Sequence, residues 1–457
     1  MNASSEYIMA FDLGSSRIVG ALGRKSESGQ LSILSMETRK VNADIRHGVV
    51  HNVEEVAMKI RDIKDCLCKS QTPELAVNHV YASINGYTLR TKDLPLNSNF
   101  DGQLIFSEKE LDELTEQIPS SIPEGFSLIN YYQQEFLIDG KLDKNPVGSM
   151  PKMVKANYKL VGAREDVVNK TETVFKNIKL TCCTSLGPVA SAEAVLTQEE
   201  KSKGVVCLDF GAETTSICVY KNDLIRYVSV LPFGGRNLTT DLLQLNMDED
   251  DAEQIKILHG NALHYTELED ESTDDAMSKD LKEVNDIFVA RIEEIVENIW
   301  AQINRSGFEP GKLLSGIVMT GGASKLANLE KLLTTKTGMA VRQALPVVQL
   351  DESSAINYGK IDLSRIIGIL LQGNDGCFHK QEVIKKEPKV VTGVEQIIDG
   401  FNEPQHEDQA LQEARKTIET KQKSDKTKKN TTKPAEKKNS KIKDLFTGLV
   451  TYLNEDK

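Results

Sequence analysis

Several features that would assign a protein to a familiar class are missing from this chain of 457 residues. No run of apolar residues approaches the ~20 that a membrane-spanning helix needs. The first residues are polar and lead at once into a strand-like segment, so we expect no signal peptide. The seven cysteines include no C-x-x-C pair. An odd number of cysteines without metal-ligand spacing indicates reduced, cytoplasmic thiols, and not a disulfide framework.

The net charge of −12 is unevenly distributed. Residues 416–457 carry twelve lysines and six acidic residues, a net charge of +6, so the rest of the chain carries −18. An acidic body argues against nucleic-acid binding, and a basic tail predicts an anionic partner such as a membrane surface. Residues 381–440 are rich in Lys, Glu, Gln and Thr. They hold too little apolar surface to fold and are predicted to form a disordered linker.

The most informative motif lies between Gly204 and Tyr220. An apolar run, Val205–Leu208, ends at Asp209 and is typical of a buried strand. Gly211 then permits a tight turn, and an apolar return strand follows. Turn amides can donate to phosphate oxygens, and a carboxylate at a strand end can hold Mg²⁺ through water. The stretch therefore predicts a phosphate-binding hairpin, although a plain hairpin turn would have the same pattern.

The same motif occurs a second time near the N-terminus. Ile8–Phe11 leads into Asp12-Leu13-Gly14, and an apolar return strand begins at Ile18. Each copy continues through a polar turn into a third strand-like segment. The duplicated three-strand meander predicts two similar lobes whose hairpins face each other across a cleft, with Asp12 and Asp209 both near a metal. The repetition favours the phosphate-binding interpretation over the plain turn.

Three further segments complete the predicted site. A Gly-Gly turn at Gly234 and Gly235 opens a helix, and a strand ends in a second glycine turn at residues 321–323. Bare glycines let a ribose or an adenine lie against the backbone. Glu253 and Lys256 lie on one face of a predicted helix. They form either a surface ion pair or a clasp on the ribose and base of a nucleotide.

Helical patterns connect these motifs. The apolar periodicity predicts helices at 53–67, 166–177 and 278–304. Ser107 and Glu110 have the spacing of a capping box. Residues 83–163 are predicted to form a compact module of strand-like pieces around that capped helix. A small-residue segment at 186–196 and an apolar helix at 363–371, with Gly368 at a close crossing, are predicted to form the hinge between the lobes.

The last segment is apolar with helical periodicity again. One predicted helix face carries six apolar residues: Ile442, Leu445, Phe446, Leu449, Val450 and Leu453. Four lysines gather at the start of this segment. Such a helix either packs onto the body of the protein or lies in a membrane interface with its lysines toward anionic lipid. The linker before it contains nothing that would direct the helix to a docking groove, so we expect the membrane-bound arrangement.

In this order, the motifs resemble those of the actin/Hsp70/sugar-kinase ATPase superfamily and, within it, the FtsA family of actin-like cell-division proteins. The segments that carry the likeness are 145–148 (N-P-V-G), 190–197 (A-S-A-E-A-V-L-T) with the Asp209 hairpin, 251–260 (D-A-E-Q-I-K-I-L-H-G) and 317–323 (I-V-M-T-G-G-A). The resemblance covers residues 8 to about 373 and the last fifteen or so. It implies an α/β fold of two actin/Hsp70-like lobes, with an inserted subdomain in lobe one, a disordered linker and a C-terminal amphipathic helix.

The resemblance also implies a division of the chain. Lobe one would comprise 1–82 and 164–203 with the subdomain 83–163 inserted, and lobe two would comprise 204–361 with a helical part at about 238–305. A hinge helix (362–376), a linker (377–440) and the membrane-targeting helix (441–454) would follow. ATP and Mg²⁺ would bind between the lobes. The implied nucleotide contacts are Asp12, Gly14, Ser15, Ser16, Arg17, Gly211, Ala212, Glu213, Thr214, Thr215, Gly234, Gly235, Glu253, Lys256, Gly321, Gly322 and Ala323.

Asp12 and Asp209 would hold Mg²⁺ through water, and Asp209 would be the catalytic residue. The chain departs from the family at the second loop, which usually reads D-I-G-G-G-T-T/M-D and here reads D-F-G-A-E-T-T-S. Glu213 therefore replaces a glycine near the phosphates, where its carboxylate either repels phosphate or turns away. No general base can be named. We expect ATP binding with weak or no hydrolysis.

The resemblance implies a peripheral protein on the cytoplasmic face of the cell membrane at the division site. It would polymerise there, tether the division protein FtsZ through the FtsZ C-terminal peptide, and recruit other divisome proteins. A small-molecule kinase and an Hsp70-like chaperone ATPase are the alternatives of the same fold. A kinase has no use for a basic tail with an amphipathic helix. A chaperone needs a β-rich substrate domain, which residues 376–457 cannot supply.

Overall fold

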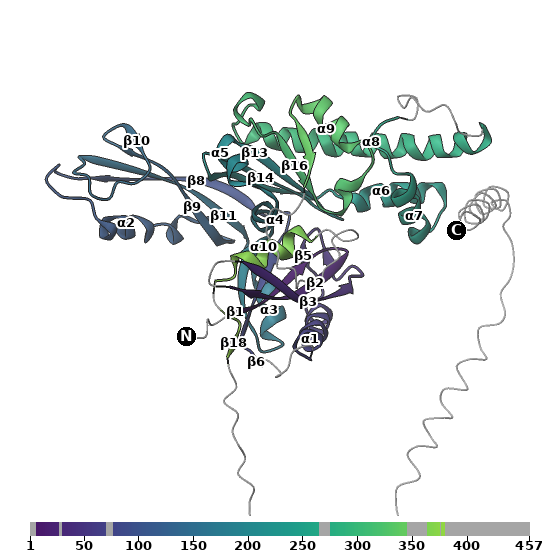
Figure 1. Ribbon diagram of the computed structural model, residues 1–457, viewed down its shortest axis with the longest axis horizontal. Helices are drawn as coiled ribbons and strands as arrows, with labels where there is room; N and C mark the ends of the chain where they lie inside the picture. Colours follow the sequence, from purple (N-terminus) through teal and green to yellow (C-terminus); the bar gives the residue numbers. More distant parts are fainter. Residues whose placement is uncertain are drawn as a thin grey trace, which may run out of the picture. The chain divides into compact units, whose positions relative to one another are not determined.

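Two five-stranded sheets with the same topology form the framework of the protein (Figure 1). The first sheet has the order β12-β7-β1-β2-β3, and the second has the order β15-β14-β13-β16-β17. In each sheet three strands form an antiparallel meander, and two further strands run parallel to the first strand of that meander. The predicted duplication of the meander is thereby confirmed.

The first sheet is built from β1 (Glu6–Leu13), β2 (Arg17–Lys25), β3 (Leu31–Lys40), β7 (His79–Ile84) and β12 (Thr181–Leu186). The second is built from β13 (Val205–Phe210), β14 (Thr215–Lys221), β15 (Leu224–Leu231), β16 (Ile317–Thr320) and β17 (Val341–Gln343). These elements belong to a computed structural model that describes residues 6–26, 30–69, 76–264, 275–344, 363–374 and 376–379. The linker predicted at 377–440 starts too early, because Cys377 is buried and Phe378 and His379 pair with Val77 and Ala76. The rest of that linker and the predicted membrane helix at 441–454 lie outside the described residues.

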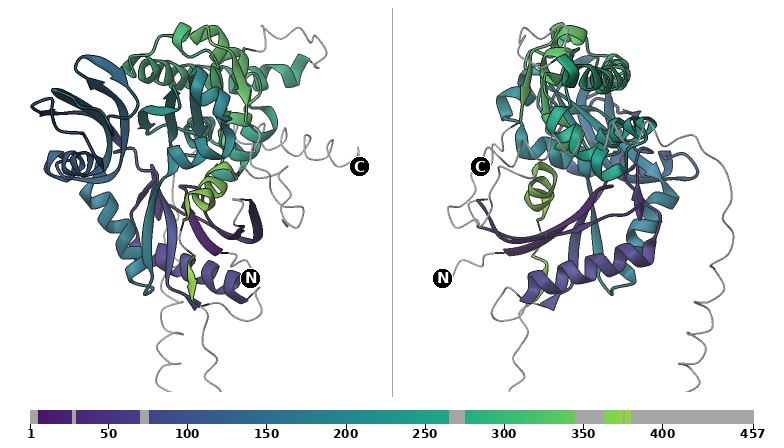
Figure 2. Two further views of the ribbon diagram at one scale, coloured as in Figure 1. Left: turned by 60° about the vertical axis from the view of Figure 1, so that its left-hand side comes forward. Right: turned by 90° about the vertical axis from the view of Figure 1, so that its right-hand side faces the viewer.

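Helices cover both faces of the first sheet (Figure 2). On one face lie α1 (Val53–Lys69) and α3 (Glu165–Lys176), and on the other lies α10 (Ser364–Gln372). Because β1 is buried on both faces, Ile8 to Phe11 form a continuous apolar run with no exposed surface. The predicted helices at 53–67, 166–177 and 363–371 are confirmed, with bounds that differ by at most two residues.

Residues of β13 alternate between the two faces of the second sheet. Val205 and Cys207 pack with the core that includes α4 (Gly187–Val195), and Val206, Leu208 and Phe210 pack with the core that includes α8 (Asp275–Arg305). The helices α6 (Gly235–Leu242), α7 (Glu249–His259) and α9 (Leu329–Thr337) complete this half of the molecule. The segment α6–α8 matches the helical part predicted at about 238–305.

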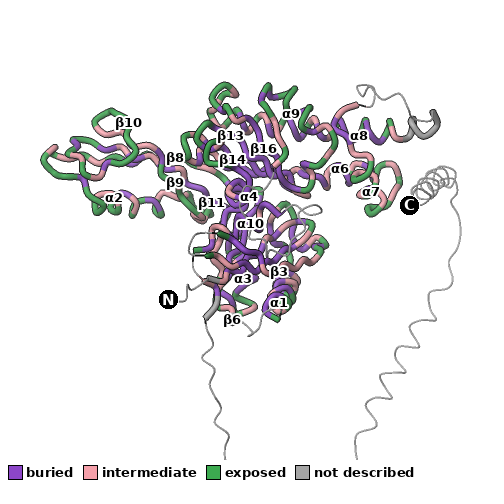
Figure 3. Tube along the Cα trace, viewed as in Figure 1, coloured by how far each residue is buried: buried purple, intermediate pink, exposed green. Residues whose placement is uncertain are grey.

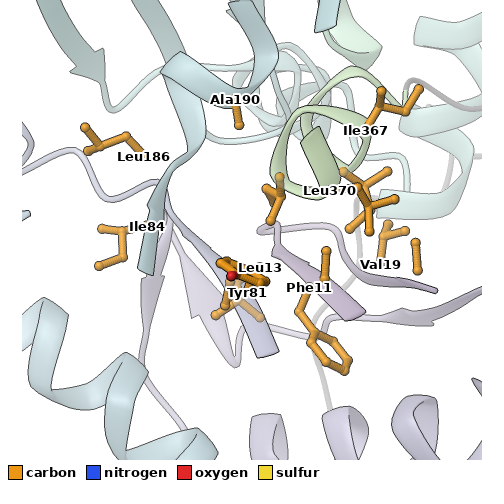
Figure 4. Packing of buried hydrophobic residues seen from close by; sticks show 14 of the residues in the cluster. Phe11, Leu13, Val19, Tyr81, Ile84, Leu186, Ala190, Ile367 and Leu370 are labelled. Atoms are coloured by element: carbon orange, nitrogen blue, oxygen red, sulfur yellow. The ribbon is translucent and has the colours of Figure 1, made fainter. Parts of the chain in front are cut away.

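A close crossing of α4 and α10 joins the two sheets. A Cβ added at Gly368 of α10 would lie 1.8 Å from the backbone oxygen of Ala190 in α4, so only glycine fits there. Around the crossing, Leu186 and Ala190 share one continuous core with Ile367 and Leu370 of α10 and with strands of both sheets (Figure 4). The predicted close crossing of small residues at Gly368 is confirmed, and its role as a hinge stays a prediction.

The inserted module has its own sheet and its own small core. Its four antiparallel strands have the order β10-β9-β11-β8, and a helix, α2 (Glu108–Thr115), begins with the predicted capping box of Ser107 and Glu110. The strands are β8 (Arg90–Asn99), β9 (Phe126–Ile138), β10 (Lys141–Asp143) and β11 (Met153–Arg164). Since residues 83 and 84 still belong to β7 of the first sheet, the module sheet begins at Arg90, later than the predicted boundary.

The module is more exposed than the two lobes (Figure 3). It is tied to the edge strand β15: the Thr91 hydroxyl donates to the Val228 carbonyl oxygen (2.7 Å), and Arg226 pairs with Glu135 of β9. The remaining short elements are β4 (Ile45–Arg46), β5 (Val49–Val50), β6 (Ala76–Val77), β18 (Phe378–His379), α5 (Gln198–Lys203) and 3₁₀ turns at 119–121, 243–245, 310–312 and 322–325. Within the described ranges, no helix combines the length and the apolar character needed to cross a bilayer.

Candidate functional site

A cavity of ≈ 470 Å³ lies between the hairpins of the two sheets. This volume falls within the ~300–1,000 Å³ typical of small-molecule sites. Most of the predicted contact residues line it: Asp12, Gly14, Ser15, Ser16, Arg17, Asp209, Gly211, Ala212, Glu213, Thr214, Gly235, Glu253, Lys256, Gly321, Gly322 and Ala323. Thr215 and Gly234 do not line the cavity. The Thr215 hydroxyl instead donates to the Phe233 carbonyl oxygen, which holds the glycine turn against the hairpin (2.8 Å).

The two hairpin turns close in the same way. The amide of Gly14 donates to the carbonyl oxygen of Arg17 (3.1 Å), and the amide of Gly211 donates to that of Thr214 (2.9 Å). A Cβ at Gly14 would come within 2.7 Å of the Arg17 oxygen that its own amide binds. The glycine of each D-x-G motif thus permits a turn in which the following residues face the cavity.

A third turn, between β4 and β5, binds both hairpins. Its residues His47 and Gly48 have positive φ angles (48° and 72°), as a two-residue type I′ hairpin requires. The Gly48 amide donates to the Ser15 hydroxyl of the first hairpin (3.1 Å). The His47 amide donates to the Glu213 carboxylate of the second hairpin (2.7 Å). One turn of the first lobe therefore contacts both loops of the cleft.

Glu213 is held from two sides. One carboxylate oxygen accepts the His47 amide, and the other accepts a hydrogen bond from the guanidinium of Arg236 at the start of α6 (3.0 Å). Only 8% of the surface of Glu213 is exposed, so its charge is buried together with its two hydrogen-bond partners. The residue that departs from the family pattern is therefore engaged in a contact across the cleft.

The carboxylates of Asp12 and Asp209 are both bound by Arg365, near the start of α10. The Arg365 Nε donates to Asp209 Oδ2 (3.0 Å), Nη2 donates to the same oxygen, and Nη1 lies 3.4 Å from Asp12 Oδ1. Burial by itself lowers the pKa of Arg365, but the charges of Asp209 and Asp12 raise it, and the net pKa lies above its ordinary value. The guanidinium is a permanent cation between the two carboxylates.

Neutral hydroxyl and amide groups orient the same two carboxylates. Asp12 Oδ1 accepts from the Ser83 hydroxyl (2.9 Å) and the Asn85 amide (3.2 Å), and Asp209 Oδ2 accepts from the Ser191 hydroxyl (2.6 Å). No group of three or more His, Cys, Asp or Glu side chains with metal-site geometry occurs among the described residues. With a guanidinium already between its predicted ligands, the pair Asp12 and Asp209 does not fit the predicted Mg²⁺ site.

Glu253 and Lys256 form a partly buried cluster on the other side of the cavity. Lys256 Nζ donates to Glu253 Oε2 (2.6 Å), to the Thr239 hydroxyl (2.9 Å) and to the Gly235 carbonyl oxygen (3.2 Å). Burial lowers the pKa of Lys256, and Glu253 offsets this only in part. Burial raises the pKa of Glu253, but the hydrogen bonds of Lys256 and Thr239 outweigh it and lower the net value. Their position in the cavity wall excludes a plain surface ion pair.

The glycine turn after β16 is shaped by two different constraints. Gly321 has φ 91°, and a Cβ there would lie 2.4 Å from the Phe210 carbonyl oxygen. A Cβ at Gly322 would meet nothing within 4 Å, although the residue lines the cavity. Gly321 is therefore required by the backbone, and Gly322 leaves open space for a ligand.

Sequence analysis did not identify several residues that the fold brings to this site: His47, Gly48, Ser83, Asn85, Ser191, Arg236, Thr239 and Arg365. One of them carries a visible signal, because Arg365 is the single charged residue in the otherwise apolar helix S-R-I-I-G-I-L-L-Q. Ser83 lies near the end of the buried strand β7 and Asn85 directly follows that strand, which is a weaker signal. Ser191 lies in the segment 190–197 that carries the family resemblance, but nothing there indicated its contact with Asp209, and His47 is ordinary in the sequence.

Comparisons with known proteins place this geometry in context. Residues 206–358 match the family model described as cell division protein FtsA. The chain is 28% identical over 363 residues to the cell division protein FtsA of Neisseria meningitidis serogroup B, covering 76% of this chain and 85% of that protein. It is 26% identical over 394 residues to the FtsA of Porphyromonas gingivalis, covering 82% and 80%.

Solved structures agree on the fold. A chain of the PilM-PilN type IV pilus biogenesis complex matches with a TM-score of 0.55 and 18% identity, covering 80% of this chain and 97% of that one. MreB5 of Spiroplasma citri bound to ADP has a TM-score of 0.46 and 11% identity, covering 79% and 94%. At 18% identity, the likeness to the chain of the pilus complex concerns the fold alone.

The duplicated sheets, the crossing of α4 and α10 and the cleft between the hairpins define a two-lobed protein with the actin-like ATPase fold. Within this class, residues 206–358 match the family model of the cell division protein FtsA, and the relatives named above are FtsA proteins to which the chain is 26–28% identical. This similarity supports a role in cell division.

Proposed function

We propose that the cleft binds ATP, with the triphosphate between the two hairpins and the adenosine against the glycine turn at residues 321–323. One observation carries this proposal: two hairpins with the same turn closure face a single cavity of ≈ 470 Å³. Gly-containing turns place backbone amides toward anions. The Glu253–Lys256 cluster lies in the same wall and supplies polar groups for a ribose or a base.

Gly322→Leu tests the nucleotide site. The new side chain would enter open space in the cavity wall, so we expect ATP affinity to fall at least tenfold with little change in the free energy of unfolding. A matched control is Gly311→Leu, because Gly311 also has nothing within 4 Å of an added Cβ but lies outside the cavity. Isothermal titration with ATP measures both variants. Equal affinities for the wild type and Gly322→Leu would reject this site. Turnover is expected to be slow or undetectable.

The protein's task in division is to link a polymer to the membrane. As a peripheral protein on the cytoplasmic face of the cell membrane at the division site, it forms filaments by head-to-tail contacts and binds FtsZ through the FtsZ C-terminal peptide. Other divisome proteins join later. Head-to-tail contacts do not close and so produce filaments.

A fluorescent FtsZ tail peptide should bind the full chain with a saturable change in anisotropy. A scrambled peptide is the control, and equal signals from both peptides would contradict the assignment.

The inserted module is proposed to set the geometry of the filament. It has its own sheet and its own core, so its removal should leave the two lobes folded. We expect a chain without residues 92–160, which hold the module's own core, to bind ATP as before but to form no filaments on lipid in electron micrographs. Loss of ATP binding as well would show that the module is part of the core fold.

Membrane attachment is assigned to the C-terminal segment on the strength of its sequence pattern. Leu445→Glu combined with Phe446→Glu should release the full chain from anionic liposomes without changing its unfolding transition, because the apolar face is lost. Lys437→Gln combined with Lys438→Gln should weaken liposome binding less than the Leu445/Phe446 variant does. The loss caused by the two lysine changes should be larger at low salt than at high salt. If the Leu445/Phe446 variant still sediments with liposomes like the wild type, the segment is not the anchor.

A further inference from the structure

Arg365 lies where the two lobes and the hinge helix meet. Its guanidinium contacts a carboxylate from each sheet, Asp12 of β1 and Asp209 of β13, while its backbone belongs to α10. The three side chains are 12%, 16% and 5% exposed, respectively, so the charges are largely removed from solvent. A buried cation in contact with two carboxylates is an internal ion cluster, not a surface pair.

The cluster is also built around this cation. Ser83 and Asn85 fix Asp12, and Ser191 fixes Asp209, in each case by donating to the oxygen that faces Arg365. Three of the five guanidinium N–H bonds are used by the two carboxylates. Arg365 itself also lines the cavity between the hairpins, so this residue borders the space proposed for the nucleotide.

We propose that Arg365 replaces the divalent cation of this cleft, so that the nucleotide is bound as metal-free ATP with the guanidinium as the fixed counter-ion of its phosphates. This inference rests on the proposed nucleotide function. A guanidinium matches phosphate oxygens with paired N–H donors, and it stays protonated at every physiological pH. The same charge repels Mg²⁺ from the two carboxylates, and the guanidinium already occupies the position between them that a water-held Mg²⁺ would need.

Metal binding without any nucleotide tests the first half of the proposal. Mn²⁺ titration followed by electron paramagnetic resonance uses the wild type, Arg365→Ala and the double variant Arg365→Ala with Asp209→Asn. We expect Arg365→Ala to bind one Mn²⁺ ion at least tenfold more tightly than the wild type, at concentrations where the wild type shows no binding. The double variant should lose this binding. Arg342→Ala is the matched control, because it removes an arginine from an ion pair elsewhere in the protein, the pair of Arg342 and Glu200.

Nucleotide binding by the wild type tests the second half. We expect ATP affinity in EDTA to equal that in Mg²⁺ within about twofold, whereas Arg365→Ala should need Mg²⁺ and lose at least tenfold in EDTA. Arg365→Lys keeps the charge and should stay independent of the metal. A tenfold loss of wild-type affinity in EDTA overturns the proposal, and so does Mn²⁺ binding by the wild type as tight as by Arg365→Ala.

The outcomes separate this inference from the nucleotide function on which it rests. If no protein binds ATP under either condition, the nucleotide function fails, and the metal-free ATP complex fails with it. The Mn²⁺ titration then still decides whether the guanidinium excludes a metal. If Arg365→Ala does not fold, the wild-type comparison of EDTA with Mg²⁺ still decides the outcome, because it needs no variant.

Discussion

The two hairpins of the cleft have the same backbone design but different connections. Both close a D-x-G turn with the same amide-to-carbonyl hydrogen bond. The first hairpin uses Ser15 to bind the β4–β5 turn of its own lobe, whereas the second uses Glu213 to bind that same turn from the other lobe. The difference shows that one changed loop residue converts a duplicated motif into a link across the cleft.

The lobes also differ in what has been added to them. Only the first lobe carries an inserted module, and that module is bound to the edge strand β15 of the second sheet through Glu135 and Arg226. The symmetric part of the molecule therefore consists of the sheets and hairpins, and the asymmetric part consists of contacts between the lobes. The following variants remove those contacts one at a time.

Gly368→Ala should have the largest effect, because it separates the two halves at their crossing. The new Cβ would overlap the Ala190 carbonyl oxygen at 1.8 Å, a backbone atom that cannot move aside cheaply. We expect the free energy of unfolding to fall by roughly 4 kcal/mol. Urea denaturation measures this loss. Gly311→Ala, where an added Cβ meets nothing, is the control and should change little.

Glu213→Gly gives the second loop the glycine typical of the family and removes the link across the cleft. The variant leaves the His47 amide and Arg236 without their shared acceptor, so we expect a loss of about 2–3 kcal/mol in stability. Glu213→Gln keeps an acceptor for the amide and should lose less. Equal unfolding midpoints for Glu213→Gly and the wild type would show that the contact contributes nothing in solution.

Acid should loosen the module from the second lobe. Hydrogen bonds from Arg226 hold the pKa of Glu135 at about 2, below its ordinary value of 4.5. A lowered pKa stabilises the folded state above about pH 4.5, and this contribution, on the order of 2 kcal/mol, is lost as the pH falls toward 2. Stability measured by urea between pH 7 and pH 2.5 should therefore decline less in Glu135→Gln than in the wild type. Parallel profiles would rule the pair out as a source of the acid sensitivity.

Ser107→Ala should have the smallest effect, because it concerns the module alone. Ser107 accepts the Lys109 amide at the start of α2, and loss of such a cap costs about 1 kcal/mol. The lobes should be unaffected, so ATP affinity is expected to stay constant. Replacement by Asp, which also caps helices, should restore the stability, as thermal unfolding can show.

Local sequence patterns determined most of the framework. Each D-x-G motif with its flanking apolar runs specifies a hairpin by itself, because the strand period and the glycine turn are properties of neighbouring residues. The same holds for the capped helix α2. It also holds for the crossing of α4 and α10, where small residues and Gly368 indicate that the two helices approach each other closely. Thr215 and Gly234 were placed in the correct segments, but packing assigns them to supporting the loop instead of lining the cavity.

The tertiary structure alone decided how charges are paired in the cleft. Arg365 meets Asp12 across 353 residues of sequence, and Glu213 meets His47 across 166. No periodicity or spacing relates residues so far apart, because their contact depends on how two sheets are joined by one helix crossing. The sequence by itself therefore determined that two carboxylate hairpins would face each other. Only the fold determined that an arginine lies between them, because a buried charge takes the partner that the packing brings to it.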